Sequence, residues 1–174
     1  TKIMTTIAIL QLYEKGAFLL DDPIEHYIPE FKKVKVLTRP DSFSSEALTI
    51  KPTIRDFLRH PSGIVYSDGE SYTDKLYLTA GFTQWNKPLE DFISAITEIP
   101  LAFQPNKKWN YGYSHDILGF LVKKVTGTPL NQYFKSTIFN PLNMKNTDFY
   151  VPKNKSYKLS NLYIHEKGKL IIED

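Results

Sequence analysis

The sequence contains no cysteine, so none of its 174 residues can form a disulfide or supply a thiol nucleophile. It also lacks any apolar run near the roughly 20 residues that a membrane-spanning helix needs. Basic residues are scattered, since the formal net charge is only +3 and the densest cluster is Lys32, Lys33 and Lys35. No nucleic-acid binding is predicted, because a contiguous basic stripe is missing. These absences exclude thiol chemistry and argue against an integral membrane segment in this chain.

Composition leaves the localisation unknown, because the N-terminus lacks the basic, apolar and small-residue regions of a signal peptide and nothing else marks a compartment. The four histidines, His26, His60, His115 and His165, show no metal-ligand spacing with one another or with acidic residues. We therefore predict no metal site and no cofactor. A hydrophobic content of 41% with 14% aromatic residues is typical of a globular domain with a sizeable core.

Both ends of the chain suggest neighbouring segments that this sequence does not contain. Thr1 opens directly into helical spacing, without a capping segment ahead of it. At the other end, residues 162–164 and 170–172 flank Glu166-Lys167-Gly168-Lys169 as a predicted hairpin, and a lone hairpin is marginal in water. We expect residues 1–174 to form one partial domain, cut within its first helix and before its sheet continues.

Helical patterns account for most of the chain between its ends. The first helix is predicted to end at Gly16, and Thr53 with Asp56 three residues later is typical of a capping box at the start of a short helix. Another helix is predicted over residues 88–98. Residues 64–87 show no sustained period and are interpreted as a surface loop of the kind that borders a site. Strand is predicted only at the very end, which makes the fold class α+β and mainly helical.

The best-specified helix follows the stretch WNYGYSHD, residues 109–116. Ser114 is predicted to be its N-cap and Gly127 the residue just after its end. Thr128 and Pro129 are predicted to be the N-cap and the first residue of the next helix. This stretch raises the question of why a tyrosine stands on a short, glycine-bearing loop at the mouth of a helix.

Several side chains near this loop have structural interpretations. Trp109 is predicted to anchor the Tyr111 loop by packing, and His60 to fix the break after the short helix. His115 is interpreted as a first-turn residue of an exposed helix. Lys2, taken alone, is an ordinary solvated lysine. A serine one helical turn before Lys2, two residues before Thr1, would point its hydroxyl at the Lys2 ammonium.

Four segments resemble, in the same order, the penicillin-recognising serine hydrolases of the class C β-lactamase type, which include low-molecular-weight penicillin-binding proteins, D-amino peptidases and related esterases. The segments are TKIMTTIAILQLYEKGAFLLDDPIEHYIPEF (1–31), LTIKPTIRDFLRHPSGI (48–64), FQPNKKWNYGYSHDILGFLVKKVTG (103–127) and IFNPLNMKNTDFYVP (138–152). Each segment alone is a weak signal, but together they cover most of residues 1–152. The family shares a Ser-x-x-Lys helix, a Tyr-x-Asn loop and a late Lys- or His-x-Gly strand.

The resemblance implies catalytic roles for Lys2 and Tyr111. A serine hydroxyl is a poor nucleophile unless a base takes its proton, and a neighbouring ammonium favours the phenolate form of a tyrosine. Tyr111 would be that base, and Lys2 would supply the field and help to move protons. Tyr113 stands where the family has the asparagine that grips a substrate amide, so Tyr113 is the predicted substrate-binding residue. That replacement weakens the case for a true β-lactamase and leaves room for an esterase.

The fold implied by the resemblance is a helical domain with part of an α/β domain, without the upstream nucleophile and the late strand. The implied function is acyl transfer through an acyl-enzyme, with an ester, a peptide containing a D-residue or a β-lactam as the small-molecule or peptide substrate. The chain as given is expected to be inactive. A non-catalytic homologue that binds cell-wall peptide or a protein partner is the alternative. The family is expected in the periplasm, outside the cell or anchored to a membrane, and the oligomeric state stays open.

Overall fold

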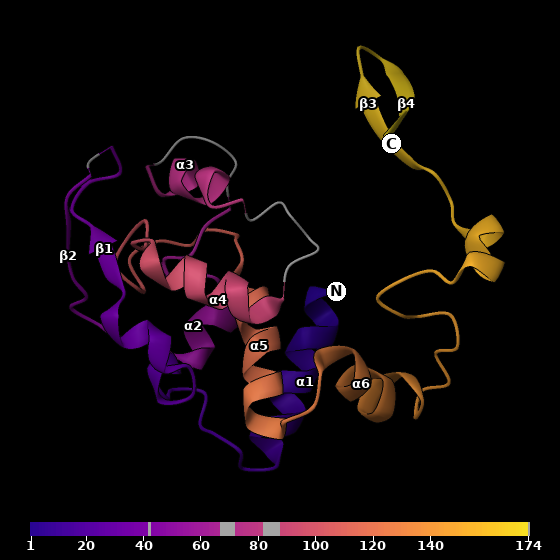
Figure 1. The fold of residues 1–174 in the computed structure, drawn as a ribbon, viewed down its shortest axis with the longest axis horizontal. Helices are drawn as coiled ribbons and strands as arrows, with labels where there is room; N and C mark the ends of the chain where they lie inside the picture. Colours follow the sequence, from indigo (N-terminus) through magenta and orange to yellow (C-terminus); the bar gives the residue numbers. More distant parts are fainter. Residues whose placement is uncertain (42, 67–71, 82–87, 174) are drawn as a thin grey trace.

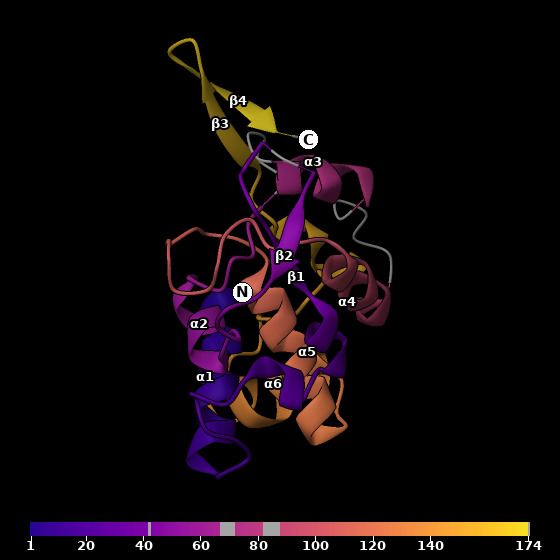
Figure 2. The ribbon, with the colours of Figure 1, turned by 90° about the vertical axis from the view of Figure 1, so that its left-hand side faces the viewer.

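The protein folds into a helical body from which a small hairpin projects, as a computed structural model shows for residues 1–41, 43–66, 72–81 and 88–173 (Figures 1 and 2). Helices dominate the body, and the strands form two separate antiparallel pairs. The helices are α1 (Lys2–Glu14), α2 (Ile54–Arg59), α3 (Tyr72–Thr79), α4 (Leu89–Glu98), α5 (Ser114–Thr126) and α6 (Leu130–Phe134). The strands are β1 (Lys35–Leu37), β2 (Ser45–Ala47), β3 (Leu162–Glu166) and β4 (Lys169–Glu173).

The core forms around α5, which packs against α1, α2, α4 and α6. Short 3₁₀ turns lie at Ile24–His26 and Pro29–Lys33, the second of them against α4, and α6 continues into a π-helical turn at Lys135–Phe139. Apolar side chains from these helices meet in a single buried cluster. Its members include Ala8, Ile9, Leu12, Phe57, Ile93, Ile96, Ile117, Leu118, Leu121, Val122 and Phe134. Helix α5 therefore fixes the position of α1, and so of Lys2, relative to the rest of the body.

The predicted ends of α1 and α5 are confirmed at their glycines. Gly16 has φ +73° and follows the last turn of α1, and Gly127 has φ +67° at the end of α5, where its N–H donates to the Lys123 carbonyl. Both are left-handed conformations that glycine adopts without steric cost. The local chemistry of the sequence is therefore sufficient to fix where these two helices end.

Two predicted helix starts are wrong by one residue. Helix α5 has Tyr113 as its N-cap, and the Ser114 hydroxyl lies 3.0 Å from the Ser62 hydroxyl in a buried contact instead of capping the helix. Helix α6 has Pro129 as its N-cap, so Thr128 lies one residue outside it. In α5, the local pattern predicts Ser114 as the N-cap, but its side chain makes a long-range hydrogen bond with Ser62 instead.

The chain has more regular structure in its middle than the sequence pattern predicts. Strands β1 and β2 pair in register from Lys35 with Ala47 to Leu37 with Ser45, whereas strand is predicted only at the C-terminal end. Helix α3 lies inside the segment 64–87, for which the pattern indicates a loop; residues 67–71 and 82–87 of that segment fall outside the described residues. Both elements are short and make few local signals, and both are held by contacts distant in sequence.

The C-terminal hairpin of β3 and β4 is confirmed, with Leu162 paired to Glu173 and Glu166 paired to Lys169. It follows an extended segment that carries a 3₁₀ turn at Lys153–Lys158, and it lies apart from the helical body in Figure 1. Every residue of both strands is exposed, including apolar Leu162, Ile164 and Leu170. The structure is thus α+β and mainly helical, as predicted.

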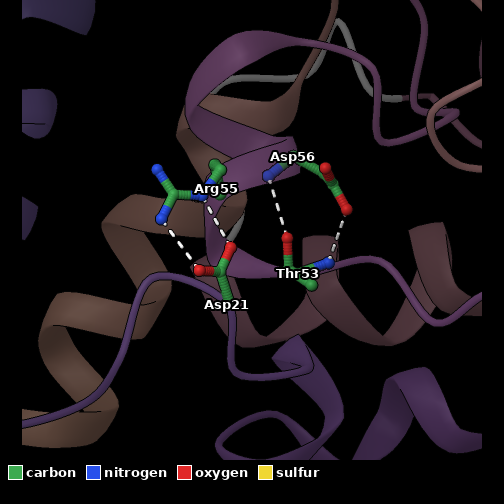
Figure 3. Close-up of polar contacts among 4 residues, drawn as sticks. All are labelled: Asp21, Thr53, Arg55 and Asp56. Atoms are coloured by element: carbon green, nitrogen blue, oxygen red, sulfur yellow. Dashed lines mark hydrogen bonds and ion pairs between the residues drawn. The ribbon is translucent and has the colours of Figure 1, made fainter.

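A capping box starts α2, as predicted (Figure 3). The Asp56 N–H donates to the Thr53 hydroxyl at 3.3 Å, and the Thr53 N–H donates to the Asp56 carboxylate at 2.9 Å. Beside it, the Arg55 guanidinium binds both carboxylate oxygens of Asp21 at 2.6 and 2.9 Å. Together these contacts fix the start of the helix whose last residue leads into His60.

The substitution Thr53→Ala is expected to lower the free energy of unfolding by about 1 kcal/mol, because it removes the side-chain oxygen that accepts from the Asp56 N–H in the capping box. Chemical denaturation followed by circular dichroism measures the change. Arg55→Ala is the matched control on the same helix, and its effect is expected to be smaller because that ion pair is solvent-exposed. An equal or larger effect of Arg55→Ala would show that the capping box does not hold α2.

Candidate active site

Lys2 and Tyr111, 109 residues apart in the sequence, come together at the N-terminal end of α1. The Lys2 Nζ atom lies 4.9 Å from the centroid of the Tyr111 ring. The same Nζ donates a hydrogen bond of 2.5 Å to the hydroxyl of Tyr66 and lies 5.2 Å from the centroid of that ring. Lys2 and Tyr111 are therefore close in space, with Tyr66 as a third member of the group, and the catalytic roles of Lys2 and Tyr111 stay a prediction.

Tyr66 is a member of this group that sequence reasoning misses. It ends the described part of the segment that follows α2, and its ring meets the ring of Tyr111 edge-on at 5.4 Å. The interpretation of this segment as a loop bordering a site is the only signal for it. A hydroxyl that contacts a lysine 64 positions away leaves no local pattern in the sequence.

The Lys2 amine is held in its charged form. Burial lowers the pKa of Lys2, but the hydrogen bond to Tyr66 and the electrostatic interactions with Tyr66, Asp116 and Tyr111 outweigh it, so the pKa is raised above its ordinary value. An ammonium beside a phenol favours the phenolate form of that phenol. Lys2 thus provides at neutral pH the positive charge that a tyrosine base would need.

The loop that carries Tyr111 is held tightly against the segment before Tyr66. The Asn110 N–H donates to the His60 carbonyl at 3.1 Å. At Gly112 a side chain would meet backbone atoms, because a Cβ there would lie 2.6 Å from the Ile64 carbonyl oxygen. Glycine at this position therefore allows the two backbones to approach, which places the Tyr111 and Tyr66 rings side by side.

Trp109 and Tyr111 lie on the solvent side of this loop. Trp109 is 64% exposed and stacks on the Tyr111 ring, with 6.5 Å between centroids. It therefore packs on Tyr111, as predicted, but from the solvent side and not as a buried anchor. Tyr111 itself is 45% exposed, so a molecule in solvent can reach it.

Tyr113 is 5% exposed, and its ring packs edge-on against the rings of Tyr66, Tyr77 and Phe92 with centroids 4.6 to 5.8 Å apart. The resemblance implies that Tyr113 contacts substrate, whereas the structure places its ring in the apolar core. The reason is that the residues on either side of it, Gly112 and Ser114, are themselves buried where α5 begins. Substrate binding by Tyr113 stays a prediction, and its visible link to the site is the contact with Tyr66.

Of the two predictions for histidines near the site, one is confirmed and the other is wrong. His60 ends α2 with φ +70°, which confirms its predicted role at the break. The expectation that His115 lies on an exposed helix surface is wrong: it is 7% exposed, and its Nε2 lies 3.0 Å from the hydroxyl of Thr6 on α1. The first turn of α5 packs against α1, which buries the ring.

A cavity of about 400 Å³ opens beside Lys2. Its walls include Lys2, Thr5, Leu89, Asp116 and Phe149. Burial raises the pKa of Asp116, although the charge of Lys2 acts in the opposite direction. Among the residues that the structure describes, no cluster of three or more histidine, aspartate or glutamate side chains could hold a metal ion.

The sequence also matches known proteins over nearly its whole length. The model of the family described as Beta-lactamase matches residues 1–170. The chain belongs to the beta-lactamase family. Among the described residues, no helix is both long enough and apolar enough to cross a membrane.

Relatives of this beta-lactamase family chain carry the names of esterases and of a synthase. It is 32% identical over 153 residues to lovastatin esterase of Penicillium rubens, covering 86% of this chain and 38% of that protein. It is 31% identical over 153 residues to esterase EstB of Burkholderia gladioli, covering 86% of this chain and 36% of that protein. The solved structure of simvastatin synthase from Aspergillus terreus superposes with a TM-score of 0.80 at 26% identity, covering 99% of this chain and 44% of that one.

The predicted partial β-lactamase-type fold is confirmed by these matches. The chain spans well under half the length of these relatives. These relatives are named as esterases and a synthase, and an enzymatic activity for this chain stays a prediction.

Proposed function

We propose that the full-length protein is a serine hydrolase or acyltransferase that acts on esters through an acyl-enzyme. A serine one helical turn before Lys2 is the nucleophile, and Tyr111 is the base that takes its proton. The observation that carries the proposal is the convergence of the Lys2 ammonium, the Tyr66 hydroxyl and the half-exposed Tyr111 ring at the N-terminal end of α1. Residues three apart on a helix share a face, so a serine at that position would lie beside the same ammonium.

The reaction follows from these positions. The serine oxygen attacks the acyl carbonyl carbon, and its proton passes to the Tyr111 phenolate, which Lys2 stabilises. The C–O bond to the leaving alcohol then breaks, and that alcohol takes the proton from Tyr111. Water or another alcohol attacks the acyl-enzyme in the same manner, which gives hydrolysis or acyl transfer and regenerates the serine.

Two further features support an ester in preference to a β-lactam. The asparagine amide of the family is replaced by Tyr113, whose ring lies in the core. The relatives with at least 30% identity include proteins named lovastatin esterase and esterase EstB. An ester substrate need not contain an amide for the asparagine to bind, so the loss of the asparagine is compatible with ester cleavage.

The experiment treats the full-length protein with p-nitrophenyl butyrate and, separately, with a fluorescent penicillin. We expect a burst of p-nitrophenol equal to the enzyme concentration followed by steady turnover, and slower or no labelling by the penicillin. Rapid penicillin labelling without ester turnover would point to a penicillin-binding protein. No reaction with either probe would contradict the proposal and favour a non-catalytic homologue that binds peptide or protein.

A further inference from the structure

Two buried histidines lie directly behind the Lys2, Tyr66 and Tyr111 group, and the proposed reaction uses neither. His60 is 8% exposed and His115 is 7% exposed. Their rings stack with centroids 4.9 Å apart and an interplanar angle of 29°. Within the described residues, the Nδ1 atom of each ring is buried without a hydrogen-bond partner. Burying two polar rings in this way costs free energy, so the arrangement calls for a physical role.

The stacked pair bridges α1 and the Tyr111 loop. On one side, the Nε2 atom of His115 lies 3.0 Å from the hydroxyl of Thr6, one helical turn after Lys2. On the other side, the ring of His60 lies 4.8 Å from the ring of Tyr111. Contacts thus run continuously from the helix that carries Lys2 to the ring proposed as the base, through Thr6, His115, His60 and Tyr111.

Backbone contacts reinforce the His60 end of this bridge. The His60 carbonyl accepts from the Asn110 N–H at 3.1 Å, and the His60 ring meets Trp109 edge-on at 6.1 Å. Tyr111 is therefore backed by His60 from inside and by Trp109 from the solvent side. If the His60 ring moves, the phenol loses the surface that holds it near Lys2.

The charged groups around the pair disfavour its protonation. Burial lowers the pKa of His60, and the positive charge of Lys2 lowers it further. Burial, the neighbouring His60 and the positive charge of Lys2 lower the pKa of His115.

Among the described residues, the acidic side chains near the pair interact with other groups. Asp116, the acid beside His115 on α5, interacts with Lys2, and Asp56 of α2 is bound by Thr53. The Tyr66 hydroxyl accepts a hydrogen bond from Lys2, and the Lys2 Nζ lies over the Tyr111 ring. The lowered pKa values favour the neutral form of both imidazoles near pH 7.

We propose that His60 and His115 are positioning residues that hold Tyr111 against Lys2 only while both imidazoles are neutral. A proton on either ring puts a second cation beside Lys2 in a buried place, so the stack opens and Tyr111 loses its backing. The effect on catalysis rests on the proposed function, whereas the coupling between the histidines and Tyr111 is a property of the fold alone.

The test is an NMR titration of the full-length protein labelled with ¹³C on the histidine and tyrosine rings, with Tyr111→Phe used to assign the Tyr111 signal. We expect the Tyr111 signal to shift on acidification in the same step as His60 and His115, below the pH at which an ordinary histidine titrates. The variant His115→Leu should remove or move that step. His165→Gln, on the exposed hairpin, is the matched control and should leave it unchanged.

Steady-state kinetics distinguish a positioning role of His60 from a merely structural one. His60→Ala is expected to lower kcat for p-nitrophenyl butyrate by about tenfold or more with little change in KM, because the base is misplaced and not the substrate. His60→Phe keeps a ring that can stack but cannot take a proton. We expect His60→Phe to recover most of the kcat that His60→Ala loses. Its activity should also fall less at acidic pH than that of the unmodified protein.

The outcomes separate this inference from the proposed function. A Tyr111 signal that stays constant while both histidines titrate, or identical acid limbs for His60→Phe and the unmodified protein, would overturn the inference even if the ester is hydrolysed. Coupled NMR signals in a protein that forms no acyl-enzyme would leave the inference standing and remove the proposed function.

Discussion

Replacing Tyr111 by phenylalanine is expected to lower kcat of the full-length protein for p-nitrophenyl butyrate by about 10²–10⁴-fold, with KM within a few-fold. The substitution removes only the phenolic oxygen, so the ring contacts with Lys2, His60 and Trp109 remain. The loss would thus report proton transfer and not misfolding. Steady-state kinetics with burst analysis measure it, because a missing base slows the acylation step itself.

Two matched variants separate this effect from other losses. Tyr66→Phe removes the hydroxyl that binds Lys2 but leaves Tyr111 in place, so its effect is expected to be smaller, on the order of tenfold. Tyr157→Phe changes an exposed tyrosine away from the site and should have no effect. If Tyr66→Phe costs as much as Tyr111→Phe or more, Tyr66 and not Tyr111 is the base.

The substitution Gly63→Ala is expected to lower the free energy of unfolding by about 2–4 kcal/mol, from left-handed strain plus overpacking. Gly63 has φ +88°, and a Cβ there would lie 2.5 Å from the Phe103 carbonyl oxygen and 3.0 Å from the Leu101 Cβ. The Phe103 oxygen is backbone, so it cannot move aside as a flexible side chain could. Gly63 also accepts a hydrogen bond from the Ala102 N–H at 3.0 Å, which the shift would disturb.

Gly16→Ala is the control for this prediction, because Gly16 has φ +73° but a Cβ added there would meet nothing within 4 Å. It therefore isolates the conformational cost, about 1–2 kcal/mol. Urea denaturation of both variants and of the unmodified full-length protein gives the two differences. Equal losses for the two glycines would show that the close approach to Phe103 contributes nothing.

Local chemistry in the sequence is enough to predict several elements of the fold. The capping box of Thr53 and Asp56 acts over three residues, and the ends of α1 and α5 depend on a single glycine each. The hairpin of β3 and β4 has its turn residues and its alternation within one short stretch. In each case the residues that decide the structure are neighbours in the chain, so their pattern can be read without knowing the fold.

The features that the sequence does not reveal depend on distant partners. The buried contact of Ser114 with Ser62, the hydrogen bonds between β1 and Leu101 and the burial of His115 against Thr6 all join segments that no local pattern connects. Tyr66 is the clearest case, because its importance comes only from a lysine on another helix. Lys2 and Tyr111 can be named in advance because the order of several segments resembles a known family, and the structure shows that the two side chains are close.

The most direct measurement is intact mass spectrometry of the full-length protein after brief exposure to p-nitrophenyl butyrate and acid quenching, followed by peptide mapping of the adduct. One butyryl group is predicted, on a serine one helical turn before Lys2, and Tyr111→Phe should prevent its formation. A butyryl group on any other residue, or no covalent adduct while the ester is turned over, would contradict the claim that Lys2 and Tyr111 serve a serine nucleophile at the start of α1.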